Sequence, residues 1–142
     1  MKINHGRELG SSSERRIDTF TGEVWGDPVL SGAEDVVINN IFFAPGGRTH
    51  WHRHGGAQVL CVVSGRGRAY SRGGEGGDIR SGDVVYVPAN EEHWHGADAD
   101  SYLVHTAITF GGHDWLDPVT DDEYQAACTR DRAAESDGRV GR

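Results

Sequence analysis

The sequence has few cysteines, no long hydrophobic run and no excess of basic residues. Its two cysteines, Cys61 and Cys128, lie far apart, which argues against a disulfide framework. No run of about 18 apolar residues could span a bilayer, and the first residues lack the apolar segment of a signal peptide. These absences predict a cytoplasmic protein that does not bind membranes.

Acidic residues outnumber basic ones by 22 to 14, which gives a formal net charge of −8. A chain of this charge is repelled by phosphate backbones, so we expect no nucleic-acid partner. The length of 142 residues suits one domain with its own core. Glycine is abundant, at 21 residues scattered along the chain, and this favours tight turns between short strands over long helices.

Apolar segments with period-two alternation predict an all-β sandwich or barrel of seven or more short strands. The clearest segments are 20–30, 36–45, 57–63, 66–71, 83–88 and 101–110. Thr120 and Glu123 fit a capping box for a short helix over about 121–130. We expect a polar N-terminal arm over residues 1–16, a folded domain over 17–128 and a disordered charged tail over 129–142.

Histidines are concentrated in two short segments of the chain. His50, His52 and His54 alternate in the first segment, and His93 and His95 alternate in the second. Side chains at positions i and i+2 of a strand share one face, so each segment is expected to present its imidazoles together. Imidazole is a common ligand of divalent transition metals, and Gln58 can add a neutral oxygen. The pattern therefore predicts a metal site.

The same residues carry a resemblance to the cupin family. The first cupin motif is matched by Gly46, His52, His54, Gln58 and Gly65, and the second by Gly82, Pro88 and His93. The sequence departs from the motifs in having Gln58 in place of the usual Glu, Asn90 in place of a Gly and Ala97 in place of a frequent Asn. The resemblance implies an all-β fold, the double-stranded β-helix or jelly-roll barrel of cupins, with a short C-terminal helix.

Further segments resemble the small bacterial cupins that include the manganese-dependent hydroxynitrile lyases. They are FTGEVWGDP at 20–28, HWHG at 93–96, His105, and DWLDPVTDDEY at 114–124. The resemblance implies one divalent metal ion per chain, manganese foremost, held by His52, His54, Gln58 and His93, with His95 and His105 as further active-site residues. Zinc, iron and nickel also accept three nitrogens and one oxygen. We expect a small-molecule substrate and a homo-oligomer, either a dimer or a tetramer.

The neutral ligand set leaves the charge of the ion uncancelled, which favours activation of a carbonyl or hydroxyl oxygen. His95 and His105 are candidate bases, because an imidazole near a cation stays neutral. The alternative role for both is to orient a ligand histidine. Strand alternation adds a candidate pocket lining, which comprises His50, Asn39, Ile41, Leu103, Ala107 and Thr109. His50 is alternatively a candidate ligand of the ion.

Four functions fit these residues. The first is a lyase that breaks or forms a carbon–carbon bond next to a carbonyl or hydroxyl group. The second is a polyketide cyclase that would use the same Lewis acid to enolise a β-keto chain. The third, an iron-dependent oxygen-using enzyme, is less favoured because the ligand set lacks a carboxylate. The fourth is a metal-binding or ligand-binding cupin without catalysis.

Overall fold

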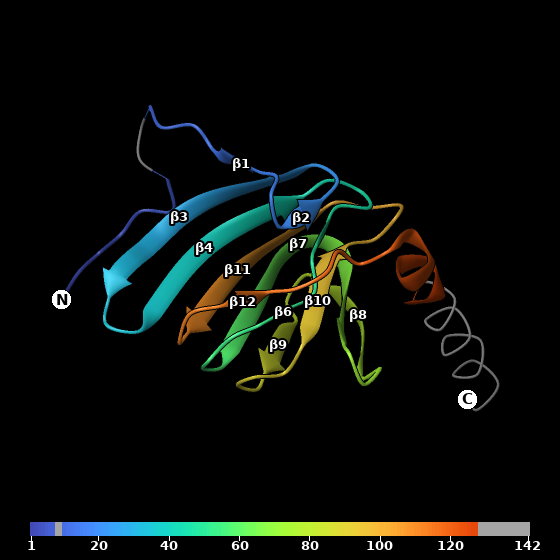
Figure 1. The fold of residues 1–142 in the computed structure, drawn as a ribbon. Helices are drawn as coiled ribbons and strands as arrows, with labels where there is room; N and C mark the ends of the chain where they lie inside the picture. Colours follow the sequence, from blue (N-terminus) through green and yellow to red (C-terminus); the bar gives the residue numbers. More distant parts are fainter. Residues whose placement is uncertain (8–9, 128–142) are drawn as a thin grey trace, which may run out of the picture.

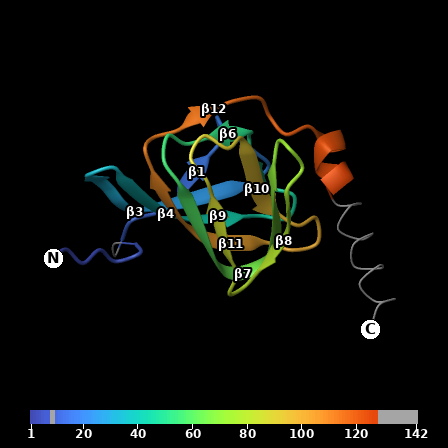
Figure 2. The ribbon, with the colours of Figure 1, turned by 90° about the horizontal axis from the view of Figure 1, so that it is seen from below.

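The strands pair into one strongly curved antiparallel sheet that forms a nearly closed barrel (Figures 1 and 2). The computed structural model describes residues 1–7 and 10–127. Its strands are β1 Glu14–Arg16, β2 Phe20–Thr21, β3 Val24–Ala33, β4 Val36–Phe43, β5 Arg48–Thr49, β6 His52–Arg53, β7 Gln58–Ser71, β8 Gly76–Arg80, β9 Val84–Val87, β10 His93–Ala97, β11 Leu103–Phe110 and β12 Asp114–Trp115. This architecture confirms the predicted all-β barrel.

Strand β7 joins the two halves of the barrel. Its first half pairs with β11 and β9, and its second half pairs with β10 and β8. The sequence pattern predicted two strands here, over 57–63 and 66–71, whereas the structure has one strand of 14 residues. Gly65, at φ 79°, lies between the two halves, where β11 also changes register. The strand bends at this glycine instead of ending.

The remaining neighbours extend each half of the sheet. On one side, β11 pairs with β4, then β3 and finally β1. On the other side, β10 pairs with β5 and β6, and these pair with β2 and β12. The core inside the barrel consists of apolar side chains, namely Val24, Ile41, Phe43, Val62, Ala69, Ile79, Ala97 and Leu103.

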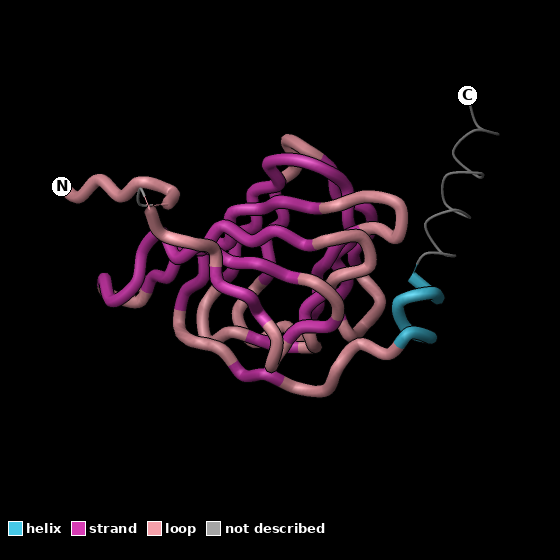
Figure 3. The backbone as a smooth tube through the Cα atoms, turned by 90° about the horizontal axis from the view of Figure 1, so that it is seen from above, coloured by secondary structure: helices cyan, strands magenta, loops and turns pink. Residues whose placement is uncertain are grey.

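A second apolar cluster lies between the barrel and the C-terminal segment, and it contains Trp51, Tyr70, Trp94, Val119, Tyr124 and Ala127. Residues 121–127 are helical and lie outside the ring of strands (Figure 3). The predicted cap is present, since the Glu123 amide donates to Thr120 Oγ1 at 3.1 Å. The Glu123 carboxylate instead accepts from Trp51 Nε1 at 2.7 Å, so the second half of the capping box is replaced by a contact with the barrel.

Buried Arg48 also joins the barrel to this segment. Its guanidinium donates to the carbonyl of Val119 and pairs with Asp121 at 2.8 Å. The predicted continuation of the helix past residue 127 and the predicted disordered tail over 129–142 lie outside the described residues. Within the described part of the chain, no helix has the length and apolar character needed to cross a membrane.

Candidate metal centre

Three buried histidines from two paired segments meet inside the barrel. His52 on β6 is directly opposite His93 on β10, and their ring centres are 4.2 Å apart. His54 follows β6, and its ring centre lies 5.0 Å from that of His52 and 5.5 Å from that of His93. The predicted grouping of His52, His54 and His93 is therefore present in the structure.

A backbone carbonyl fixes the proton of each of these three rings. The Nδ1 atoms of His52, His54 and His93 each contact a carbonyl at 2.9 Å, and the carbonyls belong to His50, Gly112 and Glu91 respectively. A carbonyl can only accept, so Nδ1 donates the proton and Nε2 is left with a lone pair. Metal-binding histidines are oriented in this way, with one nitrogen on the ion and the other donating to an acceptor.

Gln58 adds an oxygen to the three nitrogens. Its Nε2 donates to Thr109 Oγ1 at 2.9 Å, which turns Oε1 toward His93 Nε2 at 3.0 Å. Because the proton of His93 is on Nδ1, this contact brings two lone pairs together. The distance is about that between adjacent ligands of an octahedral ion with bonds of about 2.1 Å. A cation between the two atoms makes the arrangement favourable.

At neutral pH, His93 Nε2 does not carry a proton that would turn its contact with Gln58 Oε1 into a hydrogen bond. Burial lowers the pKa of His93 to about 4, so the ring does not carry the second proton that would let it donate on both sides. Burial likewise lowers the pKa of His52 and of His54. His54 Nε2 is buried and has no hydrogen-bond partner among the described residues. These orphaned acceptors fit a bound divalent ion.

Among the described residues, the group that has the nitrogen spacing of metal ligands is a different one, with His95 in the place of His54. The ligand nitrogens of His52, His93 and His95 all lie within 4.8 Å of one another. His95 differs from the other rings because its Nδ1 contacts His105 Nε2 at 3.0 Å instead of a carbonyl. The donor chemistry therefore separates the two sets, since only His52, His54 and His93 share the carbonyl support.

His95 and His105 form a fully buried pair beside these rings. Burial lowers the pKa of His95 well below its usual value and that of His105 to about 4, with the neighbouring His105 as a further cause for His95. Both rings are therefore neutral at pH 7. His95 Nε2 and His105 Nδ1 are buried without partners in the described part of the chain. The pair thus offers an unused nitrogen at each end.

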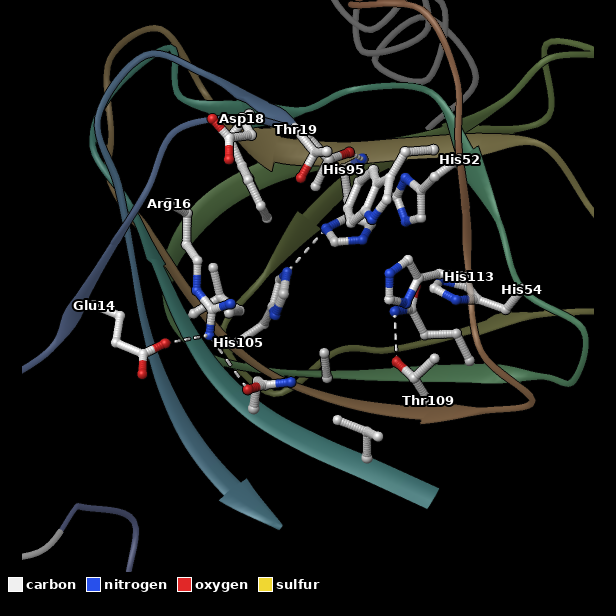
Figure 4. A pocket seen from close by; sticks show the side chains of 18 of the residues that line it. Glu14, Arg16, Asp18, Thr19, His52, His54, His95, His105, Thr109 and His113 are labelled. Atoms are coloured by element: carbon white, nitrogen blue, oxygen red, sulfur yellow. Dashed lines mark hydrogen bonds and ion pairs between the residues drawn. The ribbon is translucent and has the colours of Figure 1, made fainter. Parts of the chain in front are cut away.

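His52, His54, His95 and His105 line a cavity of about 440 Å³ (Figure 4). Four of the six predicted lining residues lie on its wall, namely Asn39, Ile41, Ala107 and Thr109. Leu103 and His50 do not. Leu103 is buried in the barrel core. The chain bends at Trp51 between β5 and β6, so the alternation that would have aligned His50 with His52 is interrupted.

The structure adds residues to the cavity that the sequence analysis did not place there. Arg16 reaches it because β1 pairs with β3, so the last part of the expected loose arm belongs to the sheet. Thr19 and Phe20 follow on the same side, and His113 and Trp115 close the cavity from the segment after β11. Local sequence carries little signal for these positions, because each depends on pairing between distant segments. His113 and Trp115 were the only residues among these whose type could have indicated a place near the site.

Comparisons with known proteins match most of the chain. The family described as "Cupin domain" matches residues 40–109. A protein of Granulicella tundricola named (R)-mandelonitrile lyase is 37% identical over 127 residues, covering 84% of this chain and 97% of that protein. A cupin-like protein from Thermotoga maritima has a crystal structure with a TM-score of 0.79 at 38% identity, covering 84% of this chain and 96% of the other.

A more distant match shows how widely the fold is shared. The polyketide cyclase from Streptomyces resistomycificus superposes with a TM-score of 0.67 at 17% identity, over 88% of this chain and 91% of that one. At this identity the likeness concerns the fold alone. Together with the strand pairing described above, these matches confirm the predicted jelly-roll barrel of the cupin type.

Proposed function

This chain belongs to the cupin family, and from that premise we propose that it is a metal-dependent lyase acting on a carbon–carbon bond next to a hydroxyl or carbonyl group. One divalent ion per chain, manganese by the resemblance, is held by His52, His54, Gln58 and His93. His95 and His105 provide the base. The observation that carries the proposal is the neutral, carbonyl-supported donor set beside a second, buried histidine pair on one cavity.

The neutrality of the donors gives the proposed site its chemical character. When bound, a divalent ion supplies a Lewis acid whose charge is not reduced by any carboxylate ligand. Thr109 holds the Gln58 amide so that its oxygen, and not its NH₂ group, faces the nitrogens. The three carbonyls hold the Nδ1 protons, so that the Nε2 lone pair of each histidine is left to bind an ion.

The His95–His105 pair is suited to accept a proton. In the proposed reaction of a cyanohydrin, His95 Nε2 removes the hydroxyl proton and the oxygen electron pair forms the carbonyl. The bond to the cyano carbon breaks, cyanide leaves with that bond's electrons, and the protonated pair returns the proton to cyanide. The products are an aldehyde and hydrogen cyanide. Buried neutral imidazoles of this kind contribute about 10²–10⁴-fold in rate.

The relative named (R)-mandelonitrile lyase supports this reaction class, because its similarity extends over most of both chains. The direct test is cleavage of mandelonitrile by the purified protein, loaded with Mn²⁺ after removal of its metal by a chelator. We expect release of benzaldehyde that depends on the ion. Release equal to the background with and without Mn²⁺ would overturn the specific activity.

The proposed base is tested separately from the metal. His105→Ala should retain the metal content of the wild-type protein, measured by elemental analysis, and lose at least about 10²-fold in turnover. An unchanged rate would remove His105 from the mechanism. If the protein binds the ion but turns over neither mandelonitrile nor a β-keto substrate, the non-catalytic binding function is favoured over the lyase and over the polyketide cyclase.

We also propose a homo-oligomer assembled through the outer face of the sheet. Apolar side chains are exposed there on neighbouring strands, with Val84 and Tyr86 each 66% exposed and Val63 56% exposed. Patches of this kind mark association surfaces. Light scattering should give a multiple of 15.4 kDa, and Val84→Lys together with Tyr86→Lys should lower it. A monomeric wild-type protein would contradict the proposal.

A further inference from the structure

Arg16 lines the cavity, and its guanidinium has no part in the proposed lyase chemistry. Arg16 lies at the end of β1, opposite Val24 of β3, and its side chain is 29% exposed. Figure 4 shows it pointing into the cavity from the side of Glu14, with His52 and His54 across the opening in this view. A permanent cation therefore faces the same space as the candidate metal centre.

The hydrogen-bonding capacity of Arg16 is only partly used. Its Nη2 makes two long contacts, to Asn39 Oδ1 at 3.5 Å and to Glu14 Oε2 at 3.4 Å. Its Nε is buried and has no partner among the described residues. A buried donor without an acceptor is costly, and an anionic ligand group would relieve that cost.

The neighbouring strand leaves room for this guanidinium. A Cβ atom added to Gly26 on β3 would lie 2.4 Å from Arg16 Nε and 2.8 Å from Nη2. Gly26 has no positive φ angle, so its backbone conformation does not require glycine. The absence of a side chain at Gly26 allows the guanidinium to lie against β3. The position of Arg16 therefore depends on residues of both β1 and β3.

The charges around Arg16 favour exchange of its present partner for a ligand. Glu14 is 59% exposed, and ion pairs with such exposed groups contribute little. The candidate metal donors are neutral, and Asp18 is the other acidic residue on the cavity wall. A carboxylate fits the fork of a guanidinium through two parallel hydrogen bonds.

We propose that Arg16 is a specificity-determining residue that binds a carboxylate of the substrate. The substrate class is then a small hydroxy or carbonyl compound with a carboxylate at the end remote from the reacting group. This inference rests on the proposed function in one respect, namely that the reacting group lies at the histidines. Asn39 positions the guanidinium through its contact with Nη2.

The test measures binding without turnover. The Mn²⁺-loaded full-length protein is titrated calorimetrically with 4-formylbenzoate and, separately, with benzaldehyde, in the absence of cyanide. We expect the wild-type protein to prefer the carboxylated aldehyde and Arg16→Gln to lose about 10- to 100-fold of that preference. Arg16→Lys, which keeps the charge without the fork, should lose less.

Two further variants keep the result interpretable. Arg66→Gln removes a cation that pairs with Asp98 and does not line the cavity, and its preference should equal that of the wild type. Gly26→Ala displaces the guanidinium without removing it and should weaken binding of 4-formylbenzoate in the same direction as Arg16→Gln. Equal preference in wild type and Arg16→Gln would overturn the proposal, because the carboxylate would then be bound elsewhere.

Turnover separates this proposal from the lyase proposal. The ratio of kcat/KM for the cyanohydrin of 4-formylbenzoate to that for mandelonitrile should fall in Arg16→Gln, mainly through KM. If neither cyanohydrin reacts but the binding preference still depends on Arg16, the lyase function fails and the carboxylate site stands. If both react with a ratio that Arg16→Gln leaves unchanged, the lyase stands and the carboxylate site fails.

Discussion

Single residues decide which nitrogens bind the ion in the proposed site. His52 and His93 are common to the carbonyl-supported set and to the set whose ligand nitrogens lie within 4.8 Å of one another, so the distinction lies between His54 and His95. His54 donates its Nδ1 proton to a carbonyl, whereas His95 faces another imidazole. These hydrogen bonds therefore suit His54 to the role of a metal ligand and His95 to the role of a base.

Replacement by asparagine separates these roles. Asparagine keeps a donor near the position of Nδ1 but has no atom at the position of Nε2, so His54→Asn can still bond the Gly112 carbonyl while losing the proposed ligand atom. We expect His54→Asn to lose at least about 10-fold in metal affinity and His95→Asn to bind the ion as the wild type does. Elemental analysis after dialysis against graded chelator measures both. The opposite result would reassign the fourth ligand to His95.

The charge of residue 58 is the second determinant at this scale. Gln58→Glu introduces the carboxylate that the cupin motif usually has, so the site should retain its ion better and activate a bound oxygen less. We expect slower loss of Mn²⁺ to a chelator together with a fall in lyase kcat of about 10-fold or more. Thr109→Val is the matched control, because it removes the partner of the Gln58 amide and leaves the donor set neutral. An unchanged kcat in Gln58→Glu would show that ligand charge does not limit the reaction.

At the scale of strands, local sequence predicted more of the fold than of the cavity wall. Strand alternation predicted that the histidines of 50–54 and of 93–95 gather at one site, and the antiparallel pairing of His52 with His93 brings the two segments together. His50 was predicted on the same face, but the bend at Trp51 separates β5 from β6. Arg16 was not predicted in the cavity, because its position depends on pairing with β3 and on the space beside Gly26.

The bend in β7 gives a prediction at this scale. Gly65 has φ 79°, and a Cβ atom there would lie 2.0 Å from the Tyr102 carbonyl oxygen. We expect Gly65→Ala to destabilise the protein by at least about 2 kcal/mol, because both the conformation and the contact oppose a side chain. Gly77→Ala on β8 is the control, since nothing lies within 4 Å of its added Cβ. Denaturant unfolding measures both, and equal midpoints would contradict this account of the bend.

At the scale of the whole molecule, the barrel keeps several neutral histidines out of water. His52, His93, His95 and His105 are each no more than 4% exposed, and burial lowers the pKa of every one of them. The unfolded chain binds protons at these residues near the usual value of 6.5, whereas the folded chain does so only at lower pH. Proton uptake therefore favours the unfolded state as the pH falls below 6.5.

This difference predicts acid sensitivity of the metal-free protein. Stability should be independent of these groups above about pH 6.5 and fall between pH 6.5 and 4, because the folded pKa values of His93 and His105 are about 4. At pH 5 each of the two costs about 2 kcal/mol. Urea unfolding at pH 7 and pH 5 measures the loss. His105→Gln should reduce it and the exposed His5→Gln should not, whereas equal stability at both pH values would contradict the burial argument.

The supports of the metal donors also set an order for assembly during protein synthesis. All four proposed donors, from His52 to His93, leave the ribosome before Thr109 and Gly112, which orient Gln58 and His54. A nascent chain ending shortly after β10 therefore has every ligand but lacks the support of two of them. High-affinity uptake of the ion should consequently follow translation of β11, so the cellular pool sampled by the finished protein determines which metal it acquires.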